Sequence, residues 1–470
     1  MVLDMSELFS NIEAFVWSPF LLIPLLLGTG LWLTIRLGLL QLRKLRPALR
    51  LGLMERSDEG GEGDISQYEA LATALAATVG VGNIVGVATA IGTGGPGALF
   101  WMWITGLVGM ASKYSESFLG VRFRKTDSAG EQLGGPQIYL RNAIPGPVGT
   151  TLGVLFAVFA SLAAFGIGNL TQANAVASNL ESAFGVDPVA AGAVLFVATG
   201  AVLLGGIKAI GKVTSAFVPL MIVLYIGAAI WVLIVNIADV PAALALIFTD
   251  AFTGTAAAGG FAGAGIILVI QMGVARGLFS NESGMGSAAI AASAAKTFHP
   301  VRQGLVSMTQ TFIDTIVVVT FTGLVIITTG VWQDGGDAGA MTARAFSAGL
   351  PGHWGDSVVA LSVVFFAFST ILGWSYYGER SFESLVGRVG IRPYRSIFTV
   401  VVFIGATTQL QTVWALSGAL NGLMAVPNLI GLVILSGLIA RETKAYLDFD
   451  PQLRATAEQV AEWEKQQKVA

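Results

Sequence analysis

The stretch Thr78-Val79-Gly80-Val81-Gly82-Asn83 interrupts an apolar segment and decides the fold. Apolar runs flank it at 71–77 and 84–88. A membrane helix satisfies its own backbone hydrogen bonds, and unwound backbone is tolerated in a bilayer only when protein buries it or it lines a wet cavity. The two glycines let a solute approach the main chain closely. We therefore expect a broken membrane helix whose free amides and carbonyls hold a small solute.

Composition places the chain among polytopic all-α membrane proteins. Of its 470 residues, 54% are hydrophobic and only 12% are charged, whereas soluble domains carry about 25% charged residues. There is no cysteine, which excludes disulfides and thiolate metal sites. Two separate histidines and no paired-carboxylate motif disfavour a membrane enzyme. A channel is also disfavoured, because no filter-like carbonyl loop repeats along the chain.

Uncharged runs divide the chain into about eleven predicted membrane helices of ~20 residues or more, the length that a bilayer requires. Their predicted ranges are 15–37, 67–90, 97–120, 149–182, 188–206, 213–238, 259–296, 302–331, 355–386, 393–411 and 414–440. On this map nearly all Lys and Arg residues fall on one side of the membrane. The positive-inside rule then places the amino terminus outside and the carboxyl terminus in the cytoplasm. We expect a multi-pass protein of the cell membrane.

A second interruption at 272–286 breaks the span 259–296. Without the first helix, the remaining ten divide into five plus five of opposite topology, and each set begins with a broken helix. Such paired interruptions are the best sequence pointer to a binding site near the membrane midplane. The predicted parts are an extra first helix with a cytoplasmic interfacial helix (1–66), a first inverted repeat (67–238), an outer loop with the second repeat (239–440), and a cytoplasmic tail (441–470).

Four ordered motifs carry a family resemblance. They are ATVGVGNI (77–84), GGPGALFWMW (94–103), RGLFSNE (276–282) and GWSYYGE (373–379), the last with Ser369-Thr370 just before it. Over about residues 67–440 the chain resembles the alanine or glycine:cation symporter family, while the tail after Arg441 lies outside the resemblance. The resemblance implies the architecture of the amino acid–polyamine–organocation superfamily with a leucine-transporter-type inverted repeat. It also implies uptake of alanine, glycine or a close relative with Na⁺, or less commonly with H⁺.

An amino acid needs positive partners for its carboxylate and acceptors for its ammonium, and the ends of half-helices provide both. The expected substrate contacts are Thr78, Gly80, Gly82, Asn83, Gln172, Gln271, Gly277, Phe279, Ser280 and Trp374. Phe279 and Trp374 are expected to keep the pocket small. Four alternatives stay open: Thr78 bonded to its own helix, Asn83 as a helix cap, Gln172 at the external interface, and Trp374 as an interface anchor.

Na⁺ is a hard ion that prefers oxygen ligands. The resemblance implies one sodium site between the first break and the ninth helix, formed by the carbonyls of Ala76 and Val79 and the hydroxyls of Ser369 and Thr370. The alternative is that both hydroxyls bond only to their own helix. A second sodium near Thr78 and Asn83 is left open. We expect no other cofactor, no nucleic acid and no obligate protein partner.

Charged residues near the middle of a predicted span need partners, because an unpaired charge there costs several kcal/mol. Arg276 and Glu282 lie in the second interruption, and Asp314 lies in the eighth span. We expect Arg276 to pair with Glu282 or Asp314. A proton-coupling role for either acid is the alternative, but the first break contains no acidic residue and neither break contains a histidine. Sodium coupling is therefore favoured.

Overall fold

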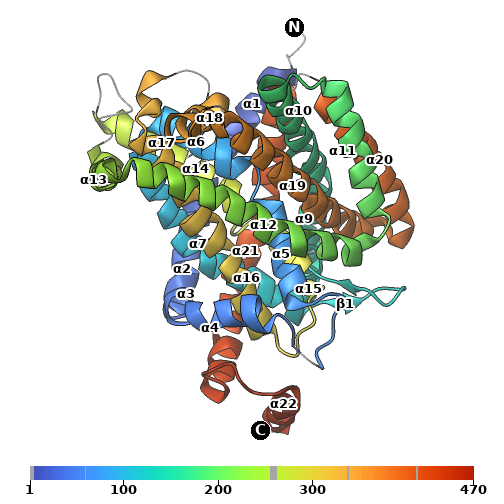
Figure 1. The fold of residues 1–470 in the computed structure, drawn as a ribbon. Coiled ribbons are helices and arrows are strands. Elements are labelled where there is room, and N and C mark those ends of the chain that lie inside the picture. Colours follow the sequence, from blue (N-terminus) through green and yellow to red (C-terminus); the bar gives the residue numbers. More distant parts are fainter. Residues whose placement is uncertain are drawn as a thin grey trace.

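The computed structural model describes residues 5–18, 20–58, 60–253, 262–335, 338–352, 354–408 and 411–469. Helices make up nearly all of this part of the chain, with the amino terminus at one end and the carboxyl terminus at the other (Figure 1). The α-helices are α1 (Met5–Val16), α2 (Leu22–Arg36), α3 (Leu40–Arg43), α4 (Leu45–Leu49), α5 (Gln67–Thr78), α6 (Val87–Gly94), α7 (Gly97–Arg122), α8 (Pro136–Ala143), α9 (Gly146–Phe165), α10 (Thr171–Phe184), α11 (Pro188–Leu203), α12 (Gly206–Val235), α13 (Val240–Thr253), α14 (Ala262–Asn281), α15 (Ser287–Ser293), α16 (Pro300–Thr311), α17 (Thr320–Thr328), α18 (Ala338–Gly349), α19 (Trp354–Val386), α20 (Ile391–Thr407), α21 (Gln411–Phe449) and α22 (Ala457–Val469).

Shorter elements connect or extend these helices. Wider π-helical turns are η1 (Arg50–Glu55), η2 (Gly82–Gly86), η3 (Gly166–Leu170) and η5 (Phe312–Val319), and 3₁₀ turns are η4 (Ile237–Asp239), η6 (Val331–Asp334) and η7 (Arg388–Gly390). One antiparallel hairpin pairs β1 (Lys125–Thr126) with β2 (Gln132–Leu133), with Lys125 opposite Leu133. Because π-helical turns are often found at functional sites, η2, η3 and η5 direct attention to the interior of the helix bundle.

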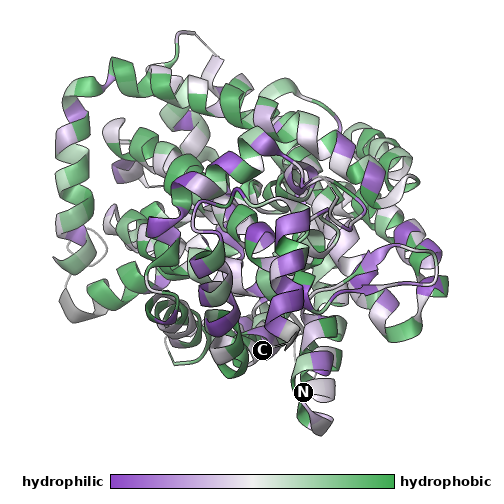
Figure 2. Ribbon diagram, turned by 90° about the horizontal axis from the view of Figure 1, so that it is seen from below, coloured by the Kyte–Doolittle hydropathy of each residue, from purple (hydrophilic) through white to green (hydrophobic). Residues whose placement is uncertain are grey.

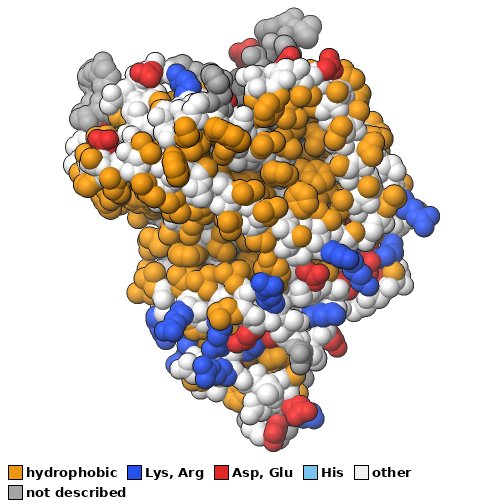
Figure 3. Space-filling model, viewed as in Figure 1, with side chains coloured by type: hydrophobic (Ala, Val, Ile, Leu, Met, Phe, Trp, Pro, Cys, Tyr) orange, Lys and Arg blue, Asp and Glu red, His pale blue; other side chains and the backbone are white. Residues whose placement is uncertain are grey.

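The apolar helices match the predicted membrane segments in type. Six helices of the described chain are long and apolar enough to cross a bilayer, and the bent pair α5–α6 passes the same test as one span. A helix also occurs in each of the eleven predicted ranges, but the count of eleven spans stays a prediction. Hydrophobic side chains cover the middle of the face seen in Figure 3. Large apolar residues such as Val197, Val223 and Ile234 are exposed on the surface of the protein, as expected for contact with lipid.

The span predicted at 15–37 is shorter in the structure, because α1 ends at Val16 and α2 begins at Leu22. Two segments predicted outside the spans are also helical. The basic stretch after Gly38 folds into α3, α4 and η1, and the segment 332–354 between two predicted spans contains α18. Buried Thr342 of α18 donates a hydrogen bond to the carbonyl of Ile84 in η2, at 2.9 Å. Helix α18 therefore packs against η2, the segment that follows the first break.

The first break lies where the sequence predicts it. The helix bends by 52° between Gln67–Thr78 and Gly82–Gly94. A capping box at Ser66 and Glu69 fixes the start of α5, since each residue binds the other's backbone N–H. The start of the first half-helix is thus fixed, and the chain unwinds at residues 79 and 80, directly after α5.

The second break is much shorter than the predicted range 272–286. Helix α14 continues unbroken to Asn281, and the chain unwinds only over 282–286, where Glu282, Gly284 and Gly286 have positive φ angles of 55°, 86° and 84°. The glycines earlier in that range serve helix packing instead. A Cβ on Gly273 would lie 2.4 Å from the carbonyl oxygen of Ala98 in α7. Close approach between helices, and not unwinding, therefore explains the first half of the glycine-rich stretch.

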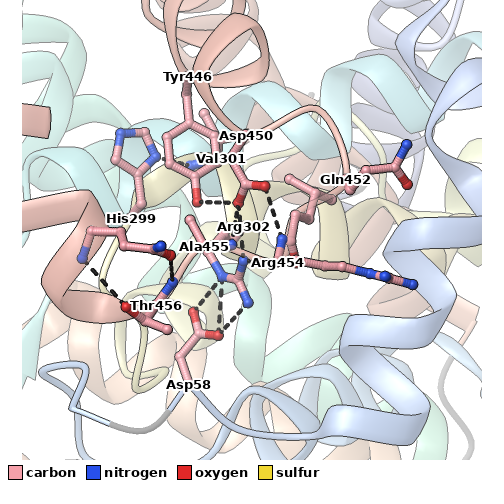
Figure 4. A network of polar contacts seen from close by, with 12 residues as sticks. Asp58, His299, Val301, Arg302, Tyr446, Asp450, Gln452, Arg454, Ala455 and Thr456 are labelled. Carbon is pink, nitrogen blue, oxygen red and sulfur yellow. Dashed lines mark hydrogen bonds and ion pairs between the residues drawn. The ribbon is translucent and has the colours of Figure 1, made fainter.

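The tail 441–470 docks against the body of the molecule. Helix α21 continues nine residues beyond the predicted boundary at 440, and α22 follows a turn. Figure 4 shows the junction: Arg302 donates to both carboxylate oxygens of Asp58, at 2.8 and 3.0 Å, and to the carbonyl of Leu453 at 3.1 Å. Asp450 lies 3.7 Å from the same guanidinium. The tail therefore ties the end of α21 to the start of α16 and to the loop before α5.

Aromatic packing completes this junction. The ring of His299 stacks on Tyr446 with centroids 3.9 Å apart, and Trp463 of α22 packs on Tyr446 and Phe449. His299 is buried and caps α16 by accepting the N–H of Val301. Burial, followed by the charges of Arg122 and Arg302, lowers the pKa of His299 to about 3. In the view from below, hydrophilic residues occupy the hairpin and the segments around the carboxyl terminus, in contrast to the mostly hydrophobic rim (Figure 2).

Candidate functional site

Asn83 organises the first break. Its Oδ1 accepts the backbone N–H of Gly80 at 2.9 Å, so the side chain reaches back over the start of the second half-helix, as the third residue of a capping box does. Its Nδ2 donates to the carboxylate of Asp314 at 2.7 Å. Asn83 is completely buried. The side chain thus acts as a cap and also reaches across the bundle to a charged group.

Asp314 joins the two breaks. It lies in η5, and besides Asn83 it accepts hydrogen bonds from the hydroxyls of Ser280 at 2.9 Å and Thr315 at 2.8 Å. All four residues are buried. Within the described residues Asp314 takes part in no ion pair; its direct partners are neutral donors. A buried carboxylate surrounded by oxygen-bearing side chains is chemically suited to a hard cation.

A second group of oxygen atoms lies on the other side of the first break. The Thr370 hydroxyl is 3.0 Å from the carbonyl oxygens of both Ala76 and Phe366. The Ser369 hydroxyl is 3.3 Å from Ala76 O and 2.8 Å from Phe366 O. Both hydroxyls therefore bond to their own helix and also reach the last turn of α5, just before the break. No hydrogen bond brings Val79 into this group; its N–H donates to Leu75 O at 2.7 Å.

Phe366 was not among the predicted residues. Its contribution is a backbone carbonyl, and its identity as phenylalanine carries no signal for an ion. The only available signal was its position one helical turn before Ser369 and Thr370, where the hydroxyls of α19 find their natural acceptor.

Gln172 lies against the first break. A Cβ on Gly80 would be 2.6 Å from the Thr370 hydroxyl and 3.5 Å from Oε1 of Gln172. Gln172 donates from Nε2 to Ile167 O at 3.0 Å, while its buried Oε1 has no hydrogen-bond partner. The side chain is 3% exposed, so it does not lie at the external interface. A buried acceptor without a donor beside an unwound backbone suits a ligand that brings its own N–H groups.

Two aromatic side chains flank the breaks. A Cβ on Gly82 would lie 3.2 Å from the ring of Phe279, and a Cβ on Gly168 of η3 would lie 2.1 Å from Cβ of Trp374. Trp374 is 1% exposed and donates its indole N–H to Glu282 Oε1 at 2.8 Å. This burial excludes the alternative of a membrane-interface anchor. Both rings are in place to limit the space around the breaks.

Three predicted residues lie apart from this arrangement or are engaged otherwise. Gly277 faces α7, since a Cβ there would be 2.4 Å from the Thr105 hydroxyl. Gln271 lies within α14, one residue before the predicted interruption but eleven before the observed one at Glu282. The Thr78 hydroxyl donates to Ala74 O at 3.0 Å and accepts from Gln310 Nε2 at 2.8 Å. The structure thus brings Gly80, Gly82, Asn83, Gln172, Phe279, Ser280 and Trp374 to the breaks.

The predicted pairing of Arg276 is wrong. No ion pair joins it to Glu282 or Asp314, both of which are described by the structure. Its guanidinium lies 6.0 Å from the ring centroid of Phe279, and the acid that acts on its charge is Glu13 of α1. The helical path of α14 explains the error, because Arg276 lies more than a turn before the unwound residues instead of among them.

Two broken helices that meet at buried polar groups define a secondary transporter with its site between the half-helices. The fold agrees with this class. The crystal structure of MhsT in complex with L-phenylalanine superposes with a TM-score of 0.53 at 15% identity, covering 82% of this chain and 99% of that one. A manganese transporter from Eremococcus coleocola gives 0.53 at 15% identity over 83% of each chain. Both have the leucine-transporter-type fold.

The chain belongs to the sodium:alanine symporter family, whose sequence profile matches residues 3–461. The match therefore includes the first helices and much of the tail, which the sequence resemblance left out. The chain is 51% identical over 449 residues to the sodium/alanine symporter AgcS of Methanococcus maripaludis, covering 94% of this chain and 98% of that protein. It is 37% identical to the probable sodium/glutamine symporter GlnT of Bacillus subtilis, covering 92% and 88%. The protein is accordingly a symporter of this family.

Proposed function

We propose that the protein imports a small neutral amino acid, alanine or glycine, together with Na⁺ by alternating access. Two observations carry the proposal: Asp314 links Asn83 at the first break to Ser280 at the end of α14, and next to Gly80 of the first break lies a buried Gln172 oxygen that has no donor. An amino acid and a monovalent cation together supply the missing charge and the missing N–H groups. Membership in a sodium:alanine symporter family supports the same pair of solutes.

The substrate is proposed to lie between the two breaks. The amino-terminal end of η2 carries partial positive charge, which suits the carboxylate. Gln172 Oε1 is proposed to accept from the ammonium. Phe279 and Trp374 are proposed to restrict the side chain to a hydrogen or a methyl group. Bulky aromatics against glycines leave little room for more.

Two oxygen clusters are proposed to hold Na⁺. The first consists of Ala76, Ser369 and Thr370, as the sequence predicts, with the carbonyl of Phe366 added and Val79 kept as a candidate. The second consists of Asn83, Ser280 and Asp314, and its carboxylate supplies the negative charge that a cation needs. Protonation of Asp314 is the rival way to neutralise this charge, so H⁺ coupling remains the alternative that the experiment below separates.

Coupling follows if each solute stabilises the conformation that binds the other. Ligands that join the two breaks would draw the half-helices together and favour closure toward the outside. Rocking of one helix bundle against the other would then open the site inward. The proposed orientation has a cytoplasmic carboxyl terminus, and on the face seen in Figure 3 most Lys and Arg side chains lie toward that end.

The test is uptake of labelled alanine into proteoliposomes that contain the purified protein. Uptake that requires an inward Na⁺ gradient, and fails with a pH gradient alone, is the expected result. The double variant Ser369→Ala, Thr370→Ala should raise the Na⁺ concentration for half-maximal uptake. Uptake driven by the pH gradient would establish H⁺ coupling instead, and uptake under neither gradient would overturn the proposed substrate.

A further inference from the structure

Trp374 lies where three irregular segments meet. Helix α19 passes the first break with Thr370 beside Gly80, and one turn later Gly373 packs on Ala77. At Trp374 the same helix contacts η3, because Gly168 has no side chain to keep the two backbones apart. The indole N–H then reaches the second break. The ring is therefore held at its Cβ end by η3 and at its nitrogen end by the unwound residues 282–286.

The group that holds the indole is the carboxyl of Glu282. Its Oε1 accepts the indole N–H at 2.8 Å, and its Oε2 accepts the Ser287 hydroxyl at 2.5 Å. Glu282 is 2% exposed, and its backbone has a positive φ of 55°, a conformation that non-glycine residues rarely adopt. Both oxygens are engaged, so the carboxyl has a fixed orientation. Glycine would adopt this backbone conformation more easily, but it has no carboxyl group to accept these two hydrogen bonds.

The nearby Lys113 does not form an ion pair with the carboxyl group of Glu282. Lys113 lies 3.3 Å from Glu116, and its Nζ donates to the backbone carbonyl of Glu282, not to the carboxyl group. Glu116 also accepts Gly286 N–H at 2.9 Å and Asn428 Nδ2 at 3.1 Å. The lysine and Glu116 thus neutralise each other and anchor the second break. The direct partners of the Glu282 carboxyl are neutral donors, although a buried acid without a counter-charge is expensive.

We propose that Glu282 is a positioning residue that sets the size limit of the substrate site through Trp374. Because Glu282 holds the indole ring of Trp374 against Gly168, the ring keeps a fixed distance from the first break. A wall that cannot rotate away excludes side chains larger than a methyl group. The inference rests on the proposed function, since it concerns which amino acids that site accepts.

The experiment compares selectivity, not activity alone. Inhibition of labelled alanine uptake is measured with unlabelled alanine, glycine, 2-aminobutyrate, valine and leucine for the wild type, Glu282→Gln, Glu282→Ala and Trp374→Phe. The ratio of the inhibition constants for valine and alanine should fall about tenfold in Glu282→Ala and in Trp374→Phe, since each loses the indole hydrogen bond. Glu282→Gln should keep the ratio within about twofold, because its amide oxygen accepts the indole N–H. The double variant Glu282→Ala, Trp374→Phe should relax the ratio no further than either single change.

The matched control is Glu379→Gln, a fully buried glutamate of α19 that binds Arg395 away from the breaks. It should lower the amount of folded protein and leave the ratio unchanged. An unchanged ratio in Glu282→Ala, or in Trp374→Phe if Glu282→Ala does not accumulate, would overturn the role of Glu282. The role of Glu282 would also be overturned if the two substitutions lowered the ratio of inhibition constants additively in the double variant. Failure of the wild type to take up alanine would instead overturn the proposed function and this inference with it.

Discussion

The helix-break site and the tail junction are both buried polar regions, but their buried charges have different partners. At the junction, Arg302 meets the carboxylates of Asp58 and Asp450, and each of its three nitrogens has an acceptor or an acidic partner. At the breaks, the partners of Asp314 among the residues that the structure describes are neutral donors, and Gln172 retains a buried acceptor without a donor. Both regions are equally shielded from solvent.

The difference separates a structural contact from a binding site. A junction that only stabilises the fold satisfies charge with charge, because a buried unpaired ion is costly. A site that must bind and release a ligand retains unsatisfied capacity that the ligand fills. Substitutions at the junction should therefore affect folding, and substitutions at the breaks should affect ligand dependence. Four changes test this contrast, from the largest expected effect to the smallest.

Arg302→Ala should destabilise the protein by about 3–5 kcal/mol, because it leaves the carboxylate of Asp58 buried without its partner. The measurement is the yield of monodisperse protein and its melting temperature in detergent. Arg454→Ala is the matched control, since its exposed side chain lies in the same tail segment. Equal stability of the two variants would show that the buried ion pair does not hold the tail.

Asp314→Asn should leave the protein folded and raise the Na⁺ concentration for half-maximal alanine uptake about a hundredfold. The amide has nearly the same shape, but it removes the negative charge, and an interaction with a charged group contributes about 1.5–3 kcal/mol. Na⁺ titration of uptake measures the effect, with melting temperature recorded in parallel. A variant with a lower melting temperature but wild-type Na⁺ dependence of uptake would show that Asp314 serves the fold and does not bind the ion.

Asn83→Ala should weaken alanine binding about tenfold, since it removes the hydrogen bond that holds Gly80 N–H and the link to Asp314. The dissociation constant of alanine, measured by calorimetry at saturating Na⁺, reports the effect. Asn179→Ala serves for comparison, because that side chain donates to Ala175 O within its own helix α10. Unaltered alanine affinity in Asn83→Ala would remove this residue from the substrate site.

His299 should make the tail junction sensitive to acid. Its folded-state pKa of about 3 lies below its ordinary value of 6.5, so the unfolded state binds more protons between these values. Its contribution to stability is present above pH 6.5 and is lost as pH falls toward 3, by about 1 kcal/mol between pH 7 and 5.5. His299→Asn keeps a helix cap and should reduce the loss of melting temperature over this range. An equally acid-sensitive variant would exclude His299 as the cause.

Local patterns in the sequence predicted the fold class and the first break correctly. The apolar runs predicted membrane helices, and the glycines at 80 and 82 marked the unwound segment. Asn83 was a candidate because it follows the first break, whereas Ser369 and Thr370 were candidates only through the family resemblance, and the roles of all three in binding stay predictions. The second break was placed too early, since glycines for packing and glycines for unwinding have the same signature in one dimension.

The sequence by itself determined which segments are helices, where the first of them unwinds, and which polar residue types are available there. Hydrophobic length and glycine content are local properties, so a single chain displays them directly. Only the tertiary structure decided the partners: Asp314 with Asn83 and Ser280, Glu282 with Trp374, and Arg302 with Asp58. These residues are separated by tens to hundreds of positions. The packing of the helices alone brings their charges and donors within hydrogen-bond distance.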